Sequence, residues 1–528
     1  MAVQGNKTQF ANGDADVVVV IGSGAGGGTL AGELAKKGID VVLLEAGKYT
    51  PNSEFLPDEW ASFKQLAWQD KRTASGTWQI ARDFPTLPAW ICKTVGGTSV
   101  HWAGASLRIQ PYEFKARTTY GNLPGANLLD WPLTREELDP YYDRAEDKMG
   151  VTRTHGMPGL PGNNNFKVMY AGATKLGYKE CSTGHMGINS ILRDGRSHCM
   201  QRGFCFQGCY FAAKWSTLYT EIPQGQATGH LELRPESQVV RIEHDAQGKV
   251  TGVLYYDAGG RLMRQKARLV ALACNSLESP RLLLGSESAM FPDGLANSSG
   301  QVGRNYMRHT TASVFASFAD KVEMFKGTTM AGIISDESVF DPKRGFVGGY
   351  HMETISLGLA FYTSFLSPGA WGADFAKAID AYAYTGGMWI VGEDMPRETN
   401  RVTLNQNVKD QFGIPVADVH VDDHPNDVAM RTHGFRQGAA VYLAAGAKQT
   451  YQVPPYPSTH NLGTCRMSAR PADGVCNRHG QSHDIPNLFI SDGSQFTTGA
   501  AENPTLTIVT LALRQADYIA DQMGRHAI

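Results

Sequence analysis

The sequence predicts an α/β protein with more than one domain. Its 528 residues exceed what a single hydrophobic core supports. Residues 14–47 follow the order strand, glycine turn, helix, strand, and the valine run of the first strand is typical of a parallel sheet covered on both faces. Residues 311–450 mix alternating strand patterns with a helical segment, which indicates a further unit of different construction.

The composition of the chain excludes several classes of function. Apolar residues make up 42% of the chain and charged residues 19%, as in ordinary soluble globular proteins. The net charge of −2 lacks the basic excess that nucleic-acid binding requires. No stretch reaches the ~18 consecutive apolar residues of a membrane helix, and the polar start does not resemble a signal peptide. Taken alone, the chain is expected in the cytoplasm.

Further elements are expected in order along the chain. Residues 111–230 look irregular, with a loop at GLPGNNN (159–165). Residues 231–273 contain short strands separated by turns. A helix is expected around residues 425–446, and residues 503–523 have the apolar periodicity of an amphipathic helix.

Gly22, Gly24 and Gly27 form a G-x-G-x-x-G turn between the first strand and the first helix. In such a turn the first glycine bends the chain, the second lets a pyrophosphate approach, and the third lets helix and strand pack closely. Glu45 ends the second strand, where a carboxylate would accept ribose hydroxyls. The pattern predicts a dinucleotide site without separating FAD from NAD. A glycine turn without a ligand is the alternative.

Two further segments carry residues suited to redox chemistry. Asn503 and Pro504 begin the last helix as expected N-cap and first helical residue, so its positive end would stabilise a reduced flavin, although an ordinary capped helix has the same signature. His460 is a candidate base for an alcohol proton, because an unperturbed histidine has a pKa of about 6.5. A purely structural histidine is the alternative reading.

Cys199, Cys205 and Cys209 fall in one short segment, whereas the other five cysteines are scattered. Three thiolates suit a soft metal or an iron–sulfur cluster. Zinc would need a fourth ligand, and His198 is badly placed to supply it beside Cys199. A disulfide plus a free thiol is the alternative, because this spacing is not a standard metal-binding run.

Five motifs together resemble the glucose–methanol–choline (GMC) oxidoreductases over essentially the whole chain. The motifs are GSGAGGG (22–28), VGGTSVHWAG (95–104), ACNSLESPRLLLGS (273–286), GQVGRNYMRH (300–309) and an ending of HNLGTCRM, NLFISDGSQF and ENPTLT. The resemblance implies FAD as cofactor, His460 as catalytic base and Asn503 as its partner beside the flavin. It implies these further cofactor contacts: Gly96, Gly97, Ser99, Val240, Ala273, Asp492, Pro504 and Thr505.

The resemblance also implies the domain layout. A Rossmann-like FAD-binding domain would be assembled from residues 1–110, 231–310 and 455–528. Residues 111–230 would form a lid with the cysteine segment, and residues 311–454 a substrate-binding domain on an antiparallel sheet.

His101 follows the paired glycines of the second motif. In family members with covalently attached flavin a histidine stands at this position, which implies a bond from His101 to the flavin 8α-methyl carbon. A histidine that only hydrogen-bonds the edge of the flavin ring is the alternative.

The cysteine segment resembles an insert found in the catalytic subunits of bacterial membrane-bound glucose, gluconate, fructose and glucoside-3 dehydrogenases. There, three cysteines hold a [3Fe-4S] cluster, a role implied here for Cys199, Cys205 and Cys209. Such subunits are exported with a small subunit that carries a twin-arginine signal, and a multihaem cytochrome c subunit anchors the complex on the periplasmic face of the inner membrane.

The leading expectation is therefore a dehydrogenase that oxidises a hydroxyl of a sugar, polyol or sugar acid. An oxygen-using oxidase of the same family is the second reading, and a lyase that keeps FAD only for structure is the third. A cytoplasmic location remains the expectation if no partner exists. No motif in residues 311–450 identifies the substrate or the oxidised carbon.

Overall fold

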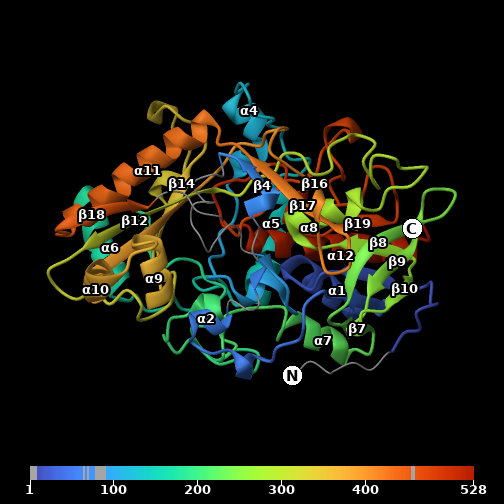
Figure 1. Cartoon of the computed structure of the whole chain (residues 1–528), viewed down its shortest axis with the longest axis horizontal. Coiled ribbons are helices and arrows are strands. Elements are labelled where there is room, and N and C mark those ends of the chain that lie inside the picture. Colours follow the sequence, from blue (N-terminus) through green and yellow to red (C-terminus); the bar gives the residue numbers. More distant parts are fainter. Residues whose placement is uncertain (1–8, 63–65, 68–70, 78–90, 454–457) are drawn as a thin grey trace.

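A five-stranded parallel sheet forms the centre of one half of the molecule in the computed structural model, which describes residues 9–62, 66–67, 71–77, 91–453 and 458–528 (Figure 1). All four strand pairings in this sheet are parallel. The strand order brings together segments from the start, middle and end of the chain: β19 (Leu488–Ile490), β11 (Leu269–Leu272), β1 (Val18–Ile21), β2 (Val41–Leu44) and β7 (Leu231–Arg234).

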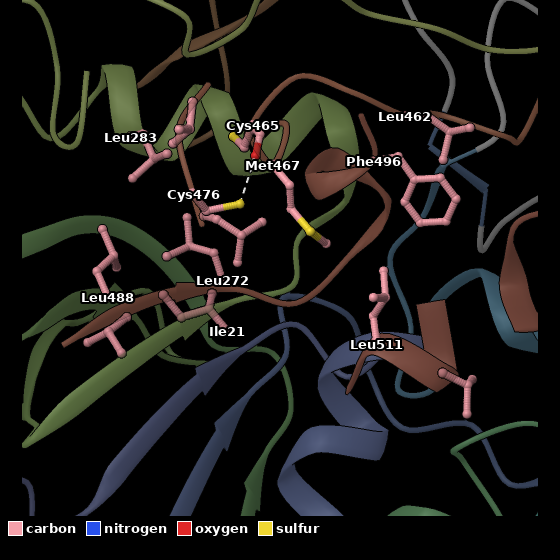
Figure 2. Close-up of a cluster of buried hydrophobic side chains, with 14 of the residues drawn as sticks. Ile21, Leu272, Leu283, Leu462, Cys465, Met467, Cys476, Leu488, Phe496 and Leu511 are labelled. Atoms are coloured by element: carbon pink, nitrogen blue, oxygen red, sulfur yellow. Dashed lines mark hydrogen bonds between the residues drawn. The ribbon is translucent and has the colours of Figure 1, made fainter. Parts of the chain in front are cut away.

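Both faces of the parallel sheet are buried, as the valine run of β1 predicts. Val18 and Val20 pack toward Leu30 and Leu34 of α1 (Ala25–Lys36). Val19 and Ile21 belong to a larger core on the opposite face. Figure 2 shows part of that core, where Ile21, Leu272 and Leu488 lie beneath Cys465 and Cys476. These two cysteines are fully buried packing residues.

Helices and a small antiparallel sheet surround the parallel sheet. Helix α1 packs against α7 (Glu221–Ala227) and α12 (Thr505–Gly524), and α12 packs against α5 (Arg135–Met149). The small sheet has the order β10 (Leu262–Lys266), β9 (Val250–Tyr256), β8 (Gln238–His244). Helix α8 (Asn275–Leu284) follows β11 and packs against β8.

The other half of the molecule is built on a six-stranded antiparallel sheet, seen on the left of Figure 1. Helix α11 (Pro425–Ala444) covers it and packs against α6 (Asn164–Leu176). The strand order is β18 (Gln449–Val453), β12 (Thr310–Ser317), β15 (Thr385–Gly392), β14 (Tyr350–Thr354), β13 (Ile333–Ile334) and β6 (Cys181–Ser182).

The described residues also form further α-helices and strands. They are α2 (Glu59–Ser62), α4 (Ala116–Tyr120), α9 (Leu359–Leu366) and α10 (Gly372–Ala381), the pair β3 (Leu66–Ala67) and β5 (Ile91–Cys92), and the sheet β16 (Arg401–Lys409), β17 (Pro415–Val421) and β4 (Ala74–Gly76). None of the helices within the described ranges is long and apolar enough to cross a bilayer.

The strand–turn–helix–strand start, the strands of residues 231–273 and the helices α11 and α12 are confirmed. The expectation that residues 111–230 are irregular is wrong, since α5 and α6 lie there. Thr134 and Glu137 form a reciprocal capping box at the start of α5. The expected loop GLPGNNN (159–165) stops at Asn163, the N-cap of α6, whose side chain accepts the Phe166 N–H, and its last two residues belong to the helix.

The proposed domain boundaries stay predictions, and the boundary at residues 454 and 455 lies outside the described residues. The parallel sheet takes strands from residues 1–110, 231–310 and 455–528. The antiparallel sheet takes β6 from residues 111–230 and its remaining strands from residues 310–453.

Candidate functional site

One large cavity, of about 620 Å³, lies between the parallel sheet and the antiparallel sheet. Its walls include the carboxyl ends of β1 and β2, where parallel sheets commonly bind ligands. Opposite them, β12, β14 and β15 contribute Thr311, Glu353, Trp389 and Val391. Twelve of the residues expected at the site line this cavity: Gly22, Gly24, Glu45, Gly97, Ser99, Val240, Ala273, His460, Asp492, Asn503, Pro504 and Thr505.

The glycines of the first turn have the steric roles that the spacing predicts. Gly22 has φ +96°, and a Cβ there would lie 2.4 Å from the Ala273 oxygen. A Cβ on Gly27 would lie 1.9 Å from the Gly22 oxygen, so this residue lets α1 pack against β1 from behind the cavity wall. Gly24 lines the cavity, and α1 starts there without a side-chain cap or an acidic residue in its first turn. Its first N–H groups therefore remain available to an anion.

Glu45 is buried at the end of β2 and closes the turn from the other side. Its carboxylate accepts hydrogen bonds from the Ser23 N–H at 3.0 Å, the Ser23 hydroxyl at 2.7 Å and the Gly47 N–H at 2.8 Å. Burial raises the pKa of Glu45, and these hydrogen bonds oppose the shift. The residue is thus held rigidly on the cavity wall, where the ribose-binding role was predicted.

The second glycine loop, residues 95–104, lies directly against the first. A Cβ on Gly97 would be 2.8 Å from the Gly24 Cα, so the two backbones meet without side chains between them. The Gly96 N–H donates to the Ser23 hydroxyl oxygen at 2.9 Å, and the Ser99 hydroxyl donates to the Gly96 carbonyl at 2.6 Å. Gly96 itself lies behind the cavity wall. Gly97 is therefore required by backbone contact, and Gly96 by its φ of +91° and by the side chains packed around it.

Asp492 ties the end of β19 to the start of α8. Its carboxylate accepts hydrogen bonds from the Asn275 N–H at 2.9 Å, the Ser279 hydroxyl at 2.6 Å and the Ser494 N–H at 2.8 Å. Val240, from β8, lines the cavity on the side of the small antiparallel sheet.

Asn503 does not cap the last helix, which corrects the sequence prediction. The N-cap position of α12 is Pro504, with φ −78°, and no side chain caps the helix. The Asn503 amide instead lies beside the Glu353 carboxylate. Its Oδ1 is buried and accepts no hydrogen bond from the described residues. Asn503, Pro504 and Thr505 line the cavity, so the uncapped positive end of α12 lies at its wall.

His460 is held by a second histidine that the sequence analysis missed. The Nδ1 atoms of His460 and His309 are 3.0 Å apart, and His309 Nε2 lies 3.0 Å from the Gly499 carbonyl oxygen. A carbonyl only accepts, so His309 carries its proton on Nε2 and its Nδ1 accepts. His460 must then donate from Nδ1, which leaves the lone pair on Nε2. Burial lowers the pKa of both rings, so both are neutral near pH 7.

The only sequence signal for His309 was its place at the end of the fourth motif, which carried no residue role. His309 adopts φ +61°, an uncommon conformation for a residue other than glycine. The Asp394 carboxylate holds this backbone by accepting the N–H groups of Arg308 at 2.8 Å and His309 at 3.0 Å. The strained conformation thus aims the His309 ring at His460.

Glu353 is the second site residue that the sequence did not reveal. It lies on β14, is fully buried and lines the cavity that contains His460. Burial raises the pKa of Glu353 to about 7, while His351 and the Asn503 amide favour its ionised form. The cavity therefore pairs a neutral imidazole with a carboxyl group that titrates near neutrality. Such a pair suits the recognition and deprotonation of a hydroxyl.

His101 is buried but is not among the residues that line the cavity. Its Nδ1 lies 2.5 Å from the Phe206 carbonyl oxygen, so Nδ1 donates to the cysteine segment. Burial lowers the pKa of His101 to about 4. The neutral ring that covalent attachment requires is present, and the link to flavin stays a prediction.

Cys199, Cys205 and Cys209 lie together in a loop next to the wall residue Phe206. All eight cysteines of the chain fall within the described residues, and none forms a disulfide. Each of the three sulfurs accepts a hydrogen bond, respectively from Gln201 Nε2 at 3.5 Å, the Thr329 N–H at 3.4 Å and the Lys214 N–H at 3.5 Å. Burial, and then the neighbouring Cys205, raises the pKa of Cys199 to about 12.

The backbone of this loop is unusually rich in left-handed residues. Positive φ values occur at Gln201, Gly203, Phe204, Gly208 and Ala212. Such turns point successive N–H groups inward and form the concave nests that hold iron–sulfur clusters and phosphates. The three sulfurs do not form a group within 4.8 Å of one another, unlike the carboxylates and imidazole of Asp143, Glu146 and His155. Three thiols close together in such a loop are a suitable donor set for an iron–sulfur cluster.

The residues present fit FAD in the large cavity. The uncapped start of α1 suits the pyrophosphate, Glu45 suits a ribose, and the unpartnered Asn503 Oδ1 and the start of α12 suit the reacting end.

Comparisons with known proteins find relatives over nearly the whole chain. Sequence models described as GMC oxidoreductase match residues 73–311 and 396–512. A 2-methyl-1,2-propanediol dehydrogenase of Mycolicibacterium austroafricanum is 35% identical over 95% of each chain. The fructose dehydrogenase large subunit of Gluconobacter japonicus is 28% identical over 96% of this chain and 98% of its own. A crystal structure of pyridoxine 4-oxidase from Mesorbium loti has a TM-score of 0.66 at 16% identity, covers 95% of this chain and 98% of its own, and supports the fold alone.

We expect alanine substitutions of two glycines in the first turn to have different effects. Gly27→Ala places a Cβ 1.9 Å from the Gly22 oxygen and 2.7 Å from the Ala273 Cβ, so we expect a loss of about 1–3 kcal/mol in unfolding free energy. Gly24→Ala meets only the Gly97 Cα at 3.9 Å and should fold normally, but it fills the space that the pyrophosphate needs. Urea unfolding of flavin-free protein and the bound flavin absorbance measure the two effects. A Gly24→Ala variant with full flavin content would contradict this assignment.

Replacing His309 tests the hydrogen-bond chain to the base. His309→Asn tolerates the positive φ but cannot reach His460, so His460 is no longer held in the tautomer with a lone pair on Nε2. We expect flavin reduction by substrate to slow about 10²- to 10³-fold with unchanged flavin content. Anaerobic stopped-flow measures the rate, and a wild-type rate in this variant rules out the positioning role.

Proposed function

The chain belongs to the GMC oxidoreductase family, and from this premise we propose that it is an FAD-dependent dehydrogenase of small polyols, sugars or sugar acids whose electrons leave through a [3Fe-4S] cluster to a cytochrome c subunit. The observation that carries the proposal is the single cavity that joins the dinucleotide turn to His460, Asn503 and Glu353. The position of the cysteine loop beside this cavity supports the proposed route for the electrons.

The substrate class follows from the cavity wall and the relatives. One relative is a diol dehydrogenase and another a fructose dehydrogenase subunit, so both act on molecules with more than one hydroxyl. Glu353 provides an acceptor for a second hydroxyl while His460 takes the proton of the first. The apolar wall residues Met330, Trp389 and Val391 would pack against the carbon skeleton.

The residues of this chain divide the work of alcohol oxidation. His460 accepts the hydroxyl proton on Nε2. The Gly499 carbonyl fixes the tautomer of His309, and His309 in turn keeps the lone pair of His460 on Nε2. The Asn503 amide orients the substrate oxygen, and the positive end of α12 favours negative charge beside it. FAD, held by the glycine turn, Glu45 and the 95–104 loop, supplies the hydride acceptor.

The cysteine loop would hold the second cofactor through Cys199, Cys205 and Cys209. A cluster there supplies a one-electron carrier between a two-electron donor and a haem that accepts single electrons. The hydrogen bonds that the three sulfurs already accept are a known means of adjusting the potential of such a cluster.

The electron route implies partners and a location. The relative from Gluconobacter japonicus is a large subunit of a dehydrogenase. We therefore expect a small subunit with a twin-arginine signal and a multihaem cytochrome c subunit, with the complex on the periplasmic face of the inner membrane.

Anaerobic purification, with the neighbouring genes co-expressed, tests the proposal as a whole. We expect about three irons per chain and substrate oxidation that reduces cytochrome c faster than oxygen. Flavin fluorescence that stays with the acid-denatured chain would support the His101 link. An iron-free protein that produces hydrogen peroxide would instead establish an oxidase.

Cys205→Ser separates the two cofactors. We expect loss of iron and of cytochrome c reduction, while flavin content and flavin reduction by substrate stay within about twofold of wild type, because the cysteine is outside the cavity wall. Cys181→Ser is the matched control, since Cys181 is an equally half-buried thiol on β6. Unchanged iron in Cys205→Ser would remove the cluster from the account.

Glu353→Gln tests the second hydroxyl contact through its pH dependence. The Glu353 pKa is raised to about 7, so the carboxylate that accepts the substrate hydrogen bond is present above that pH and lost below it. We expect wild-type kcat/KM to rise as pH increases through about 7. The amide variant should lose this rise and about tenfold in kcat/KM at pH 8, the difference between a charged and a neutral acceptor. A variant that keeps the rise would assign it to another group.

A further inference from the structure

Lys214 follows the cysteine loop and is one of the most deeply buried cations in the described structure. Only 1% of the residue is exposed. Its Nζ donates to the Val100 carbonyl at 2.8 Å, the Trp102 carbonyl at 2.6 Å and the Cys205 carbonyl at 2.7 Å. The first two carbonyls belong to the second glycine loop on the cavity wall, and the third belongs to the cysteine loop. One ammonium group therefore joins both loops.

No carboxylate within the described ranges forms an ion pair with Lys214. The buried lysine Lys148, in contrast, pairs with Glu33 at 2.9 Å and Glu221 at 3.0 Å. A buried ammonium without a counter-charge is costly, even when its three protons are donated to carbonyls. The ionisable groups that favour its charge are Cys205, Cys209 and Cys92, of which the first two are the expected cluster ligands.

A bound iron–sulfur cluster would supply the negative charge with which Lys214 could pair. Cysteines bind metal as thiolates, so a cluster on three cysteines carries net negative charge. This charge increases by one unit when the cluster takes up an electron. A fixed positive charge nearby in a medium of low dielectric constant stabilises the reduced form more than the oxidised form.

We propose that Lys214 is the internal counter-cation of the cluster and fixes the cysteine loop against the flavin-side loop, which raises the reduction potential of the cluster so that it draws electrons from the flavin. The inference rests on the proposed electron route and adds the residue that sets its direction. Lys214 does not line the cavity, and it contacts the cysteine loop only through the Cys205 carbonyl and the Cys209 sulfur, so it is a positioning residue.

Two substitutions separate its charge from its hydrogen bonds. Lys214→Gln is neutral but keeps N–H donors for the carbonyls, whereas Lys214→Arg keeps the charge. Arg202→Met is the matched control, because Arg202 lies in the same loop but is exposed, and solvent screens its charge.

The test is a potentiometric titration of the cluster followed by electron paramagnetic resonance, with iron and flavin counted in each purified protein. Lys214→Gln should keep its iron but shift the reduction equilibrium at least tenfold toward the oxidised cluster, which is 59 mV for a one-electron couple. Lys214→Arg should stay near wild type. If the cluster reduction potential of Lys214→Gln differs from that of wild type no more than the potential of Arg202→Met does, the counter-cation role is wrong. The proposed function is then unaffected. Wild-type protein without iron overturns both.

Discussion

The backbone contact between two glycine loops is the constraint on which the rest of the site depends. Gly97 lies so close to Gly24 that it has no room for a side chain, and Ser23 links the loops by donating to Glu45 and accepting from Gly96. The cavity floor is therefore made of main chain, which a pyrophosphate and a flat ring can approach closely. The cysteine loop is then attached to the second glycine loop through His101 and Lys214.

Burial is the largest cause of the pKa shifts of His460, His309 and Glu353 in the cavity. It keeps His460 and His309 neutral, so that a backbone carbonyl decides which nitrogen of His460 holds its lone pair. The same burial moves the pKa of Glu353 upward to about 7. The His460 imidazole is thus neutral and the Glu353 carboxyl group titrates near neutral pH, without an ion pair between them.

The sequence predicted those parts of the fold and site that are local. The glycine turn, Glu45 and the cysteine spacing each involve neighbours along the chain or one strand–helix unit. Some local signals were also missed, since the capping box formed by Thr134 and Glu137 marks the start of α5. Asn503 was predicted to cap α12, but its amide lies beside Glu353, a contact between distant segments. His309, Glu353 and Lys214 could not be found from the sequence, because their roles arise from burial and from partners far along the chain.

We propose two redox centres in series within this one chain, and counting electrons tests their presence most directly. The anaerobic protein would be titrated with its alcohol substrate while flavin absorbance and the cluster signal are followed together. Two electrons for the flavin and one for the cluster predict an end point of about 1.5 equivalents of substrate per chain. An end point of about one equivalent, with no second signal, would contradict the account and leave a flavin-only enzyme.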